Sequence, residues 1–184
     1  MKHLFLALLV GFSLTTCRER EPDPNILPPA TQSGANTAGC LVNGKVLVFA
    51  RSKKDNFSPE ESFYQPSMDG KSFRIKLYMG SIKNDVNKGR FDLFLRSDKR
   101  LELNKKYIVG DTTDIANKDF PSNNLLIGYR DNGYRTDNNY KCEIIFTKVT
   151  QGGIASGTFS GKLRGIRFPE KVIVITDGRF DIKL

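Results

Sequence analysis

The chain has 184 residues, a formal net charge of +9 and a single histidine, His3. His3 lies in a segment that we expect to be removed, so the mature chain can hold neither a Ser-His-Asp or Cys-His catalytic system nor a histidine-ligated zinc or copper site. About 150 residues then remain for folding, which predicts one domain with one core that needs no metal to be stable.

The first seventeen residues, MKHLFLALLVGFSLTTC, predict export and attachment to a membrane. Lys2 precedes an apolar run over 4–14, which is too short to cross a bilayer and is typical of a secretory signal. The ending Leu14-Thr15-Thr16-Cys17 resembles the lipobox of bacterial lipoproteins, in which the cysteine is acylated and becomes the new N-terminus. An ordinary thiol or an uncleaved anchor helix is less favoured, because charged residues begin directly after Cys17. The expected location is the cell envelope, at the outer membrane, with a lipid anchor.

Three segments follow from this interpretation. Residues 1–16 form the expected signal peptide, 17–38 a lipidated N-terminus and flexible tether, and 39–184 a single β domain. The tether holds four prolines and no hydrophobic periodicity, which favours an extended chain. Its apolar Ile26 and Leu27 allow part of it to pack on the domain.

The first strand signals begin at Cys40. Asn43-Gly44, between two apolar runs, predicts a hairpin with a two-residue type I′ turn. Pro59-Glu60-Glu61 allows a single helical turn. Alternation with a period of two predicts half-buried strands over 73–79 and 90–96, and shorter apolar runs predict strands over 106–110 and 125–129.

The last third of the chain predicts longer strands. One strand is expected at 139–149, after a turn at 131–133. A second is expected at 154–163, after the turn at Gly152-Gly153. The third is expected at 171–184, with a bulge or short turn at Asp177-Gly178. Residues 172–175 are apolar at successive positions, which is typical of a strand covered on both faces. Since no longer segment has helical periodicity, the predicted fold class is all-β, an antiparallel β-sandwich or partly closed β-barrel with little helix.

A resemblance supports this organisation. LPPATQSGANTAGCLVNGKV at 27–46, together with IIFTKV, SGTFSG and ITDGRFDIKL near the end, resembles an uncharacterised family of Bacteroidota lipoproteins classed as a domain of unknown function. The resemblance covers nearly the whole mature chain, and its N-terminal block is the most specific part. It implies an envelope lipoprotein with a β-rich domain, and it supplies no catalytic residues.

The sequence motifs do not support an enzyme. GTFSGK at 157–162 lacks both the spacing of a phosphate-binding loop and the Ser or Thr after its lysine. The polar loops 111–119 and 131–139 could offer oxygen ligands to calcium, but neither has EF-hand spacing. Carboxylates such as Asp111, Asp114 and Glu143 could serve glycoside hydrolysis only where two of them stand about 5 to 10 Å apart. We therefore expect no enzymatic activity, no cofactor and no metal.

Cys40 and Cys142 form one possible disulfide, because export favours oxidation. Nothing in the sequence places the two thiols together, so two separate buried thiols stay an alternative. A bridge would close a loop of about 100 residues and contribute as much as about 4.7 kcal/mol in the chain-entropy model.

A candidate ligand-binding cluster of tyrosines and arginines brackets the predicted turn at 131–133. Its members could hold a planar or anionic ligand, or they could be half-buried strand residues. The basic surplus could attract anionic lipid headgroups or acidic polysaccharide, or form a solvated sheet face. Export argues against nucleic acid, so the expected partners are a membrane through the lipid anchor, envelope proteins and anionic glycans. The cluster consists of Tyr129, Arg130, Tyr134 and Arg135, with Tyr140 nearby.

The expected function is that of an envelope-anchored lipoprotein with a non-enzymatic binding or structural β domain. Two alternatives stay open. A histidine-free carboxylate glycan hydrolase needs an open cleft with two facing carboxylates. A carrier of a small apolar ligand needs an unfilled barrel interior, whereas sandwiches pack theirs.

Overall fold

A computed structural model describes residue 23 and residues 25–50, 62–80, 89–110, 123–130 and 132–184. This part of the chain contains eleven β-strands and no helix, which confirms the predicted all-β fold. It accordingly has no helix that is long and apolar enough to span a membrane. The expected signal peptide, Cys17, the possible helical turn at 59–61 and the polar loop 111–119 lie outside the described residues.

The domain opens with the predicted hairpin, formed by β1 (Thr37–Val42) and β2 (Lys45–Ala50). Asn43 and Gly44 have φ angles of 49° and 78°, the positive values that a type I′ turn requires. The backbone N–H of Asn43 donates to the carbonyl of Val174 at 2.9 Å, and its side-chain oxygen accepts from the Val174 N–H at 2.8 Å. These bonds fix the hairpin to β11 (Val172–Lys183), so the first and last strands are neighbours.

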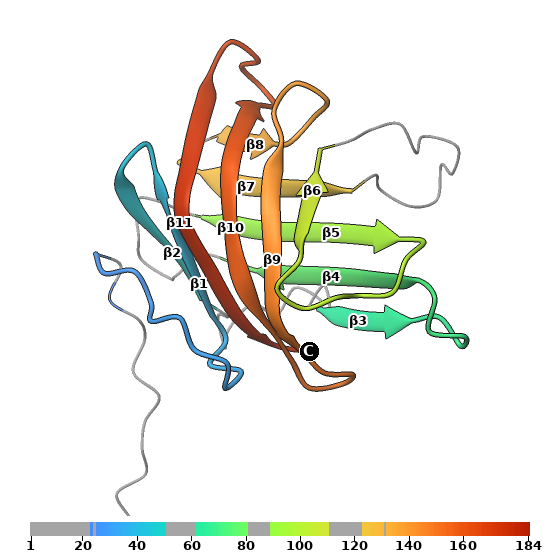
Figure 1. The fold of residues 1–184 in the computed structure, drawn as a ribbon. Helices are drawn as coiled ribbons and strands as arrows, with labels where there is room; N and C mark the ends of the chain where they lie inside the picture. Colours follow the sequence, from blue (N-terminus) through green and yellow to red (C-terminus); the bar gives the residue numbers. More distant parts are fainter. Residues whose placement is uncertain (1–22, 24, 51–61, 81–88, 111–122, 131) are drawn as a thin grey trace, which may run out of the picture.

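The strands form two layers that share one long strand, β10 (Ile154–Gly165). Most of β10 pairs with β9 (Cys142–Val149), whereas its last residues pair with β8 (Asn132–Arg135). One layer therefore has the order β2-β1-β11-β10-β9-β6, and the other has the order β10-β8-β7-β5-β4-β3. In Figure 1 the first layer runs across the second, and the curled antiparallel sheet forms a half-barrel. The remaining strands are β3 (Phe63–Pro66), β4 (Phe73–Met79), β5 (Arg90–Ser97), β6 (Lys106–Val109) and β7 (Asn124–Tyr129).

Glycines let β10 lie close to its neighbours. A Cβ at Gly157 would lie 2.2 Å from the carbonyl oxygen of Ile145 on β9, and one at Gly161 would lie 2.3 Å from the carbonyl oxygen of Lys141. Real Cβ atoms do not approach that closely, so only glycine fits at these positions. The GTFSGK segment is therefore a glycine-spaced strand, as expected once a phosphate-binding loop had been excluded.

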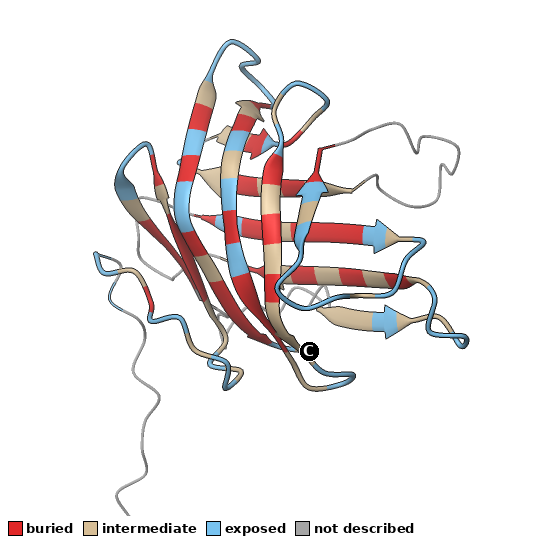
Figure 2. Ribbon diagram, viewed as in Figure 1, coloured by how far each residue is buried: buried red, intermediate tan, exposed pale blue. Residues whose placement is uncertain are grey.

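The core lies between the two layers and has aromatic rings at its centre. Phe91 of β5 contacts Phe159 of β10 and Phe180 of β11, with ring centroids 5.2 Å and 6.2 Å apart. All three rings are buried, and Figure 2 shows how buried and less buried residues alternate along the strands. Side chains from both layers thus fill the space between them, as in a packed sandwich.

The structure corrects three details of the predicted strands. β3 and β8 have no clear sequence signal, and β8 occupies most of the predicted turn at 131–133. Arg130, directly before that predicted turn, has a left-handed φ angle of 54°. The expectation that 172–175 is covered on both faces is wrong, because Val174 is 40% exposed on the outer face of the half-barrel while Ile173 and Ile175 are buried.

Candidate functional site

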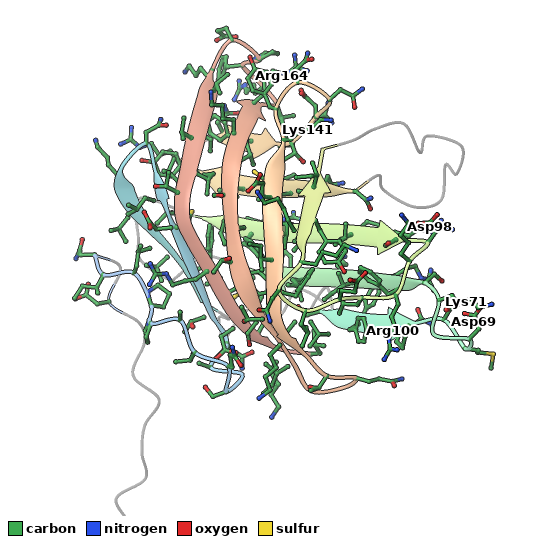
Figure 3. The ribbon with its side chains drawn as sticks, in the orientation of Figure 1. Asp69, Lys71, Asp98, Arg100, Lys141 and Arg164 are labelled. Carbon is green, nitrogen blue, oxygen red and sulfur yellow. The ribbon has the colours of Figure 1, made fainter. Side chains whose placement is uncertain are left out.

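Two segments that are far apart in the sequence meet at one end of the half-barrel. Antiparallel pairing of β8 with β10 places Arg135 directly opposite Arg164. The backbone N–H of Ile166 donates to the carbonyl of Gly133 in β8 at 2.8 Å, so β8 and the β10–β11 hairpin are in contact. Figure 3 labels Arg164 and Lys141 at this end. We call it the basic end and define it by Arg130, Arg135, Lys141, Lys162, Arg164, Arg167 and Lys171.

The four residues of the predicted cluster differ in how far they are exposed at the surface. Tyr134 is only 7% exposed and belongs to the core, so it is not available at the surface. Tyr129 is half-buried, and the guanidinium of Arg130 lies over its ring at 5.2 Å from the centroid. Arg135 is exposed. Ligand binding by this cluster stays a prediction. The members that a ligand could reach at the surface are Tyr129, Arg130 and Arg135.

Arg164 organises the loop between β8 and β9. Its guanidinium lies 2.8 Å from a carboxylate oxygen of Asp137 and 5.9 Å from the ring centroid of Tyr140. The other carboxylate oxygen of Asp137 accepts bonds from the backbone N–H groups of Asn139 and Tyr140, at 2.9 Å and 3.0 Å. Asp137 of the predicted polar loop therefore serves the local structure, which disfavours it as a calcium ligand, whereas Asp131 lies outside the described residues.

The tip of the β10–β11 hairpin adds apolar side chains to the basic end. Ile166 is 46% exposed and Phe168 is 38% exposed. The ammonium of Lys171 lies 4.5 Å from the centroid of the Phe168 ring, and the guanidinium of Arg167 lies 5.5 Å from it. This tip was not predicted from the sequence, although IRFPEK at 166–171 interleaves cations with two large apolar residues at a proline-marked turn.

A shallow groove of about 310 Å³ crosses the outer face of β9, β10 and β11. Glu143 of β9 and Asp177 of β11 line opposite sides of it, because β10 lies between their strands. Two strand spacings separate their backbones, roughly 10 Å. Glu143 forms an ion pair with Lys106 at 2.9 Å. The complete lining is Ala30, Glu143, Ile145, Thr158, Phe159, Ser160, Asp177, Gly178 and Arg179.

Asp181 is a buried carboxylate that holds part of the expected tether against the domain. It is 1% exposed on the outer face of β11, where residues 31–35, here called the strap, cover it. Burial alone would raise the pKa of Asp181, but the hydrogen bonds outweigh burial and hold the pKa well below its usual range. The donors are Thr31 Oγ1 at 2.6 Å, Ser156 Oγ at 2.7 Å, and the backbone N–H groups of Gly34, Ser33 and Ala35 at 2.9, 3.0 and 3.1 Å.

Cys40 and Cys142 are both fully buried as free thiols. Burial raises the pKa of Cys142 to about 12. Burial and, to a lesser degree, the neighbouring Cys142 raise the pKa of Cys40. Both side chains therefore stay neutral at physiological pH, and the disulfide stays a prediction.

The described residues contain no group of three or more His, Cys, Asp and Glu side chains that could hold a metal ion. Asp111 and Asp114, the other two carboxylates considered for hydrolysis, lie outside the described residues. Comparison with known proteins finds no matching family model, no matching curated protein and no matching solved structure.

Proposed function

We propose that this chain is a lipid-anchored protein of the cell envelope whose β domain binds an anionic partner, without catalysis, through the basic end. The observation that carries the binding proposal is the meeting of β8 and the β10–β11 hairpin. Their contact brings cations from two distant segments to one surface and leaves Ile166 and Phe168 exposed among them. Clustered positive charge attracts anionic partners over distances of about 10 Å.

The anchor is the second part of the proposal and rests on the sequence. Cys17 follows a short apolar run and precedes the charged residues 18–21, so the apolar run ends where acylation would begin. Each buried CH₂ of an acyl chain adds about 0.8 kcal/mol, so two or more chains hold a protein on a membrane. The predicted location at the outer membrane and the resemblance to envelope lipoproteins agree with this anchor.

A non-enzymatic role is supported by the placement of the polar groups. The mature chain would have no imidazole for acid–base or nucleophilic catalysis. Two enclosed carboxylates, Asp181 and Asp137, are used in hydrogen bonds and ion pairs that maintain the fold. The aromatic packing between the layers likewise favours a surface-binding domain over a carrier with an internal ligand.

A carboxylate glycan hydrolase is the second candidate, because Glu143 and Asp177 line opposite sides of the same groove. Glu143 is, however, already engaged in the ion pair with Lys106, so its carboxylate is not free for a substrate. The groove is also open on the outer face of the sheet. A hydrolase would lose glycan cleavage in Glu143→Gln and in Asp177→Asn, whereas a binding protein shows no cleavage in any of the three forms.

Partitioning between detergent and water tests the anchor. Wild-type protein expressed with its signal should incorporate labelled fatty acid and enter the detergent phase, and Cys17→Ala should do neither. Cys142→Ala is the matched control, because it removes a buried thiol and leaves the lipobox intact. Detergent partitioning of Cys17→Ala after signal cleavage would contradict the proposal.

A further inference from the structure

The tip of the β10–β11 hairpin, residues 166–171, is exposed at all six positions. Its sequence, IRFPEK, places Ile166 and Phe168 beside Arg167 and Lys171. Large apolar side chains on a surface mark an interaction site when they gather in one place. Here they gather at a protruding turn, which suits insertion into a partner better than docking of a flat face.

The tip backbone is held by hydrogen bonds, so its side chains are presented in a defined arrangement. The N–H of Gly165 donates to the carbonyl of Lys171 at 2.8 Å, and the N–H of Lys171 donates to the carbonyl of Phe168 at 2.9 Å. The contact between Ile166 and Gly133 fixes the hairpin to the second layer. A partner would therefore meet a preformed wedge and would not have to order it.

In the two strands that lead to the tip, basic residues of β10 pair with apolar residues of β11. Lys162 pairs with Val174, and Arg164 pairs with Val172. Over 162–171 the sequence has four cations, Lys162, Arg164, Arg167 and Lys171, and one anion, Glu170, for a net charge of +3; Arg164 is already paired with Asp137. The hairpin thus combines exposed aliphatic and aromatic groups with positive charge on the same projection.

We propose that this tip binds the surface of an anionic phospholipid bilayer, with Phe168 and Ile166 inserted at the level of the headgroups and the neighbouring cations on lipid phosphates. Aromatic and aliphatic side chains flanked by Lys and Arg favour that interface. An acidic polysaccharide would be attracted by the charge but offers little apolar surface for Ile166. The inference rests on the proposed function, since the Cys17 anchor is what keeps the domain at a membrane.

A single tryptophan at the tip provides the test, because the chain has none. The acylated Phe168→Trp protein is reconstituted with vesicles of phosphatidylcholine, or of equal parts phosphatidylcholine and phosphatidylglycerol, each with and without brominated acyl chains. In the anionic vesicles, bromine should quench the fluorescence of the introduced indole, and its emission should shift to shorter wavelength. The control is Met68→Trp, in the turn that Figure 3 labels at Asp69 and Lys71, away from Arg164. It should show neither effect.

Removing tip charge should weaken insertion by a calculable amount. Each Lys or Arg near an anionic surface is worth about 1 kcal/mol, or about fivefold in an equilibrium constant. Adding Arg167→Gln and Lys171→Gln to Phe168→Trp should therefore lower the ratio of inserted to free tip by about 25-fold. Adding Lys71→Gln and Lys99→Gln, two exposed positions elsewhere, should leave the ratio unchanged.

The anchor and the tip can fail separately in this experiment. Flotation on neutral vesicles reports the anchor. Quenching of the indole in Phe168→Trp reports the tip, and it can also be measured at excess lipid for protein that lacks an anchor. Equal quenching in Phe168→Trp and Met68→Trp would overturn the tip inference. So would a blue shift of the Phe168→Trp emission with soluble polygalacturonate in the absence of quenching by anionic lipid.

Discussion

Asp181→Asn is expected to loosen the strap and destabilise the domain together. The substitution preserves the size of the side chain but removes its charge. It also replaces one acceptor oxygen with an NH₂ group, which is a donor and would face N–H and O–H donors. A hydrogen bond to a charged group contributes about 1.5–3 kcal/mol, and such contributions do not add. The Ser156 hydroxyl, which is fully buried while the strap is in place, also loses its charged acceptor. We therefore expect the free energy of unfolding to fall by about 2–4 kcal/mol.

Urea unfolding measures the loss of stability in Asp181→Asn, and amide hydrogen exchange measures the loosening of the strap. A loss of about 2–4 kcal/mol corresponds to a fall in Tm of about 5–15 °C for a domain of this size. The amides of Ser33, Gly34 and Ala35 should exchange faster in Asp181→Asn. Asp177→Asn is the matched control, since it makes the same change on the same strand at an exposed position. A difference between the two variants below about 0.5 kcal/mol would refute the role given to Asp181.

The pH dependence of this difference follows from the lowered pKa of Asp181. A carboxyl group with a lower pKa in the folded state stabilises the fold above its unfolded pKa, near about 3.9, and loses that contribution as the pH falls towards the folded value. The stability difference between wild type and Asp181→Asn should therefore be constant from about pH 5 to 8 and shrink below about pH 4. A difference that shrinks instead as the pH rises over that range would contradict this sign.

Two further predictions concern the core. Gly157→Ala should destabilise the domain by about 1–3 kcal/mol or more, because the new Cβ would lie 2.2 Å from the carbonyl oxygen of Ile145, whereas Ser160→Ala on the same strand should be nearly neutral in urea unfolding. Cys40 and Cys142 should resist alkylation at about pH 8 in the native protein, because both thiols are buried and have raised pKa values. Rapid labelling without denaturant would contradict this prediction and show that the core is open.

Much of the fold could be predicted, because short segments of the sequence determine individual turns and strands. Asn43-Gly44 supplies the two positive φ angles of its turn, and the alternation in 73–79 matches β4 residue for residue. β3 and β8 could not be predicted in the same way, since each has four residues and shows no clean alternation of buried and exposed positions. Val174 is exposed because the curvature of the sheet, which the local pattern does not encode, decides which face of β11 is covered.

The candidate site was less predictable, because long-range pairing assembles it. The β8–β10 contact joins Arg135 to Arg164, and nothing near either residue indicates the other. Tyr134 belongs to the predicted cluster but faces the core, whereas Phe168 at the tip was not singled out. Asp181 and Thr31 are 150 positions apart, so a buried carboxylate that binds the expected tether leaves no local signal.

Mass spectrometry of the mature N-terminal peptide tests the central proposal, a lipid-anchored envelope protein, most directly. The proposal predicts a chain that begins at Cys17 and carries acyl chains on that residue, with residues 1–16 absent. Cys17→Ala should yield no acylated peptide. A mature chain that retains residues 1–16, or one in which Cys17 is an unmodified thiol, would contradict the account.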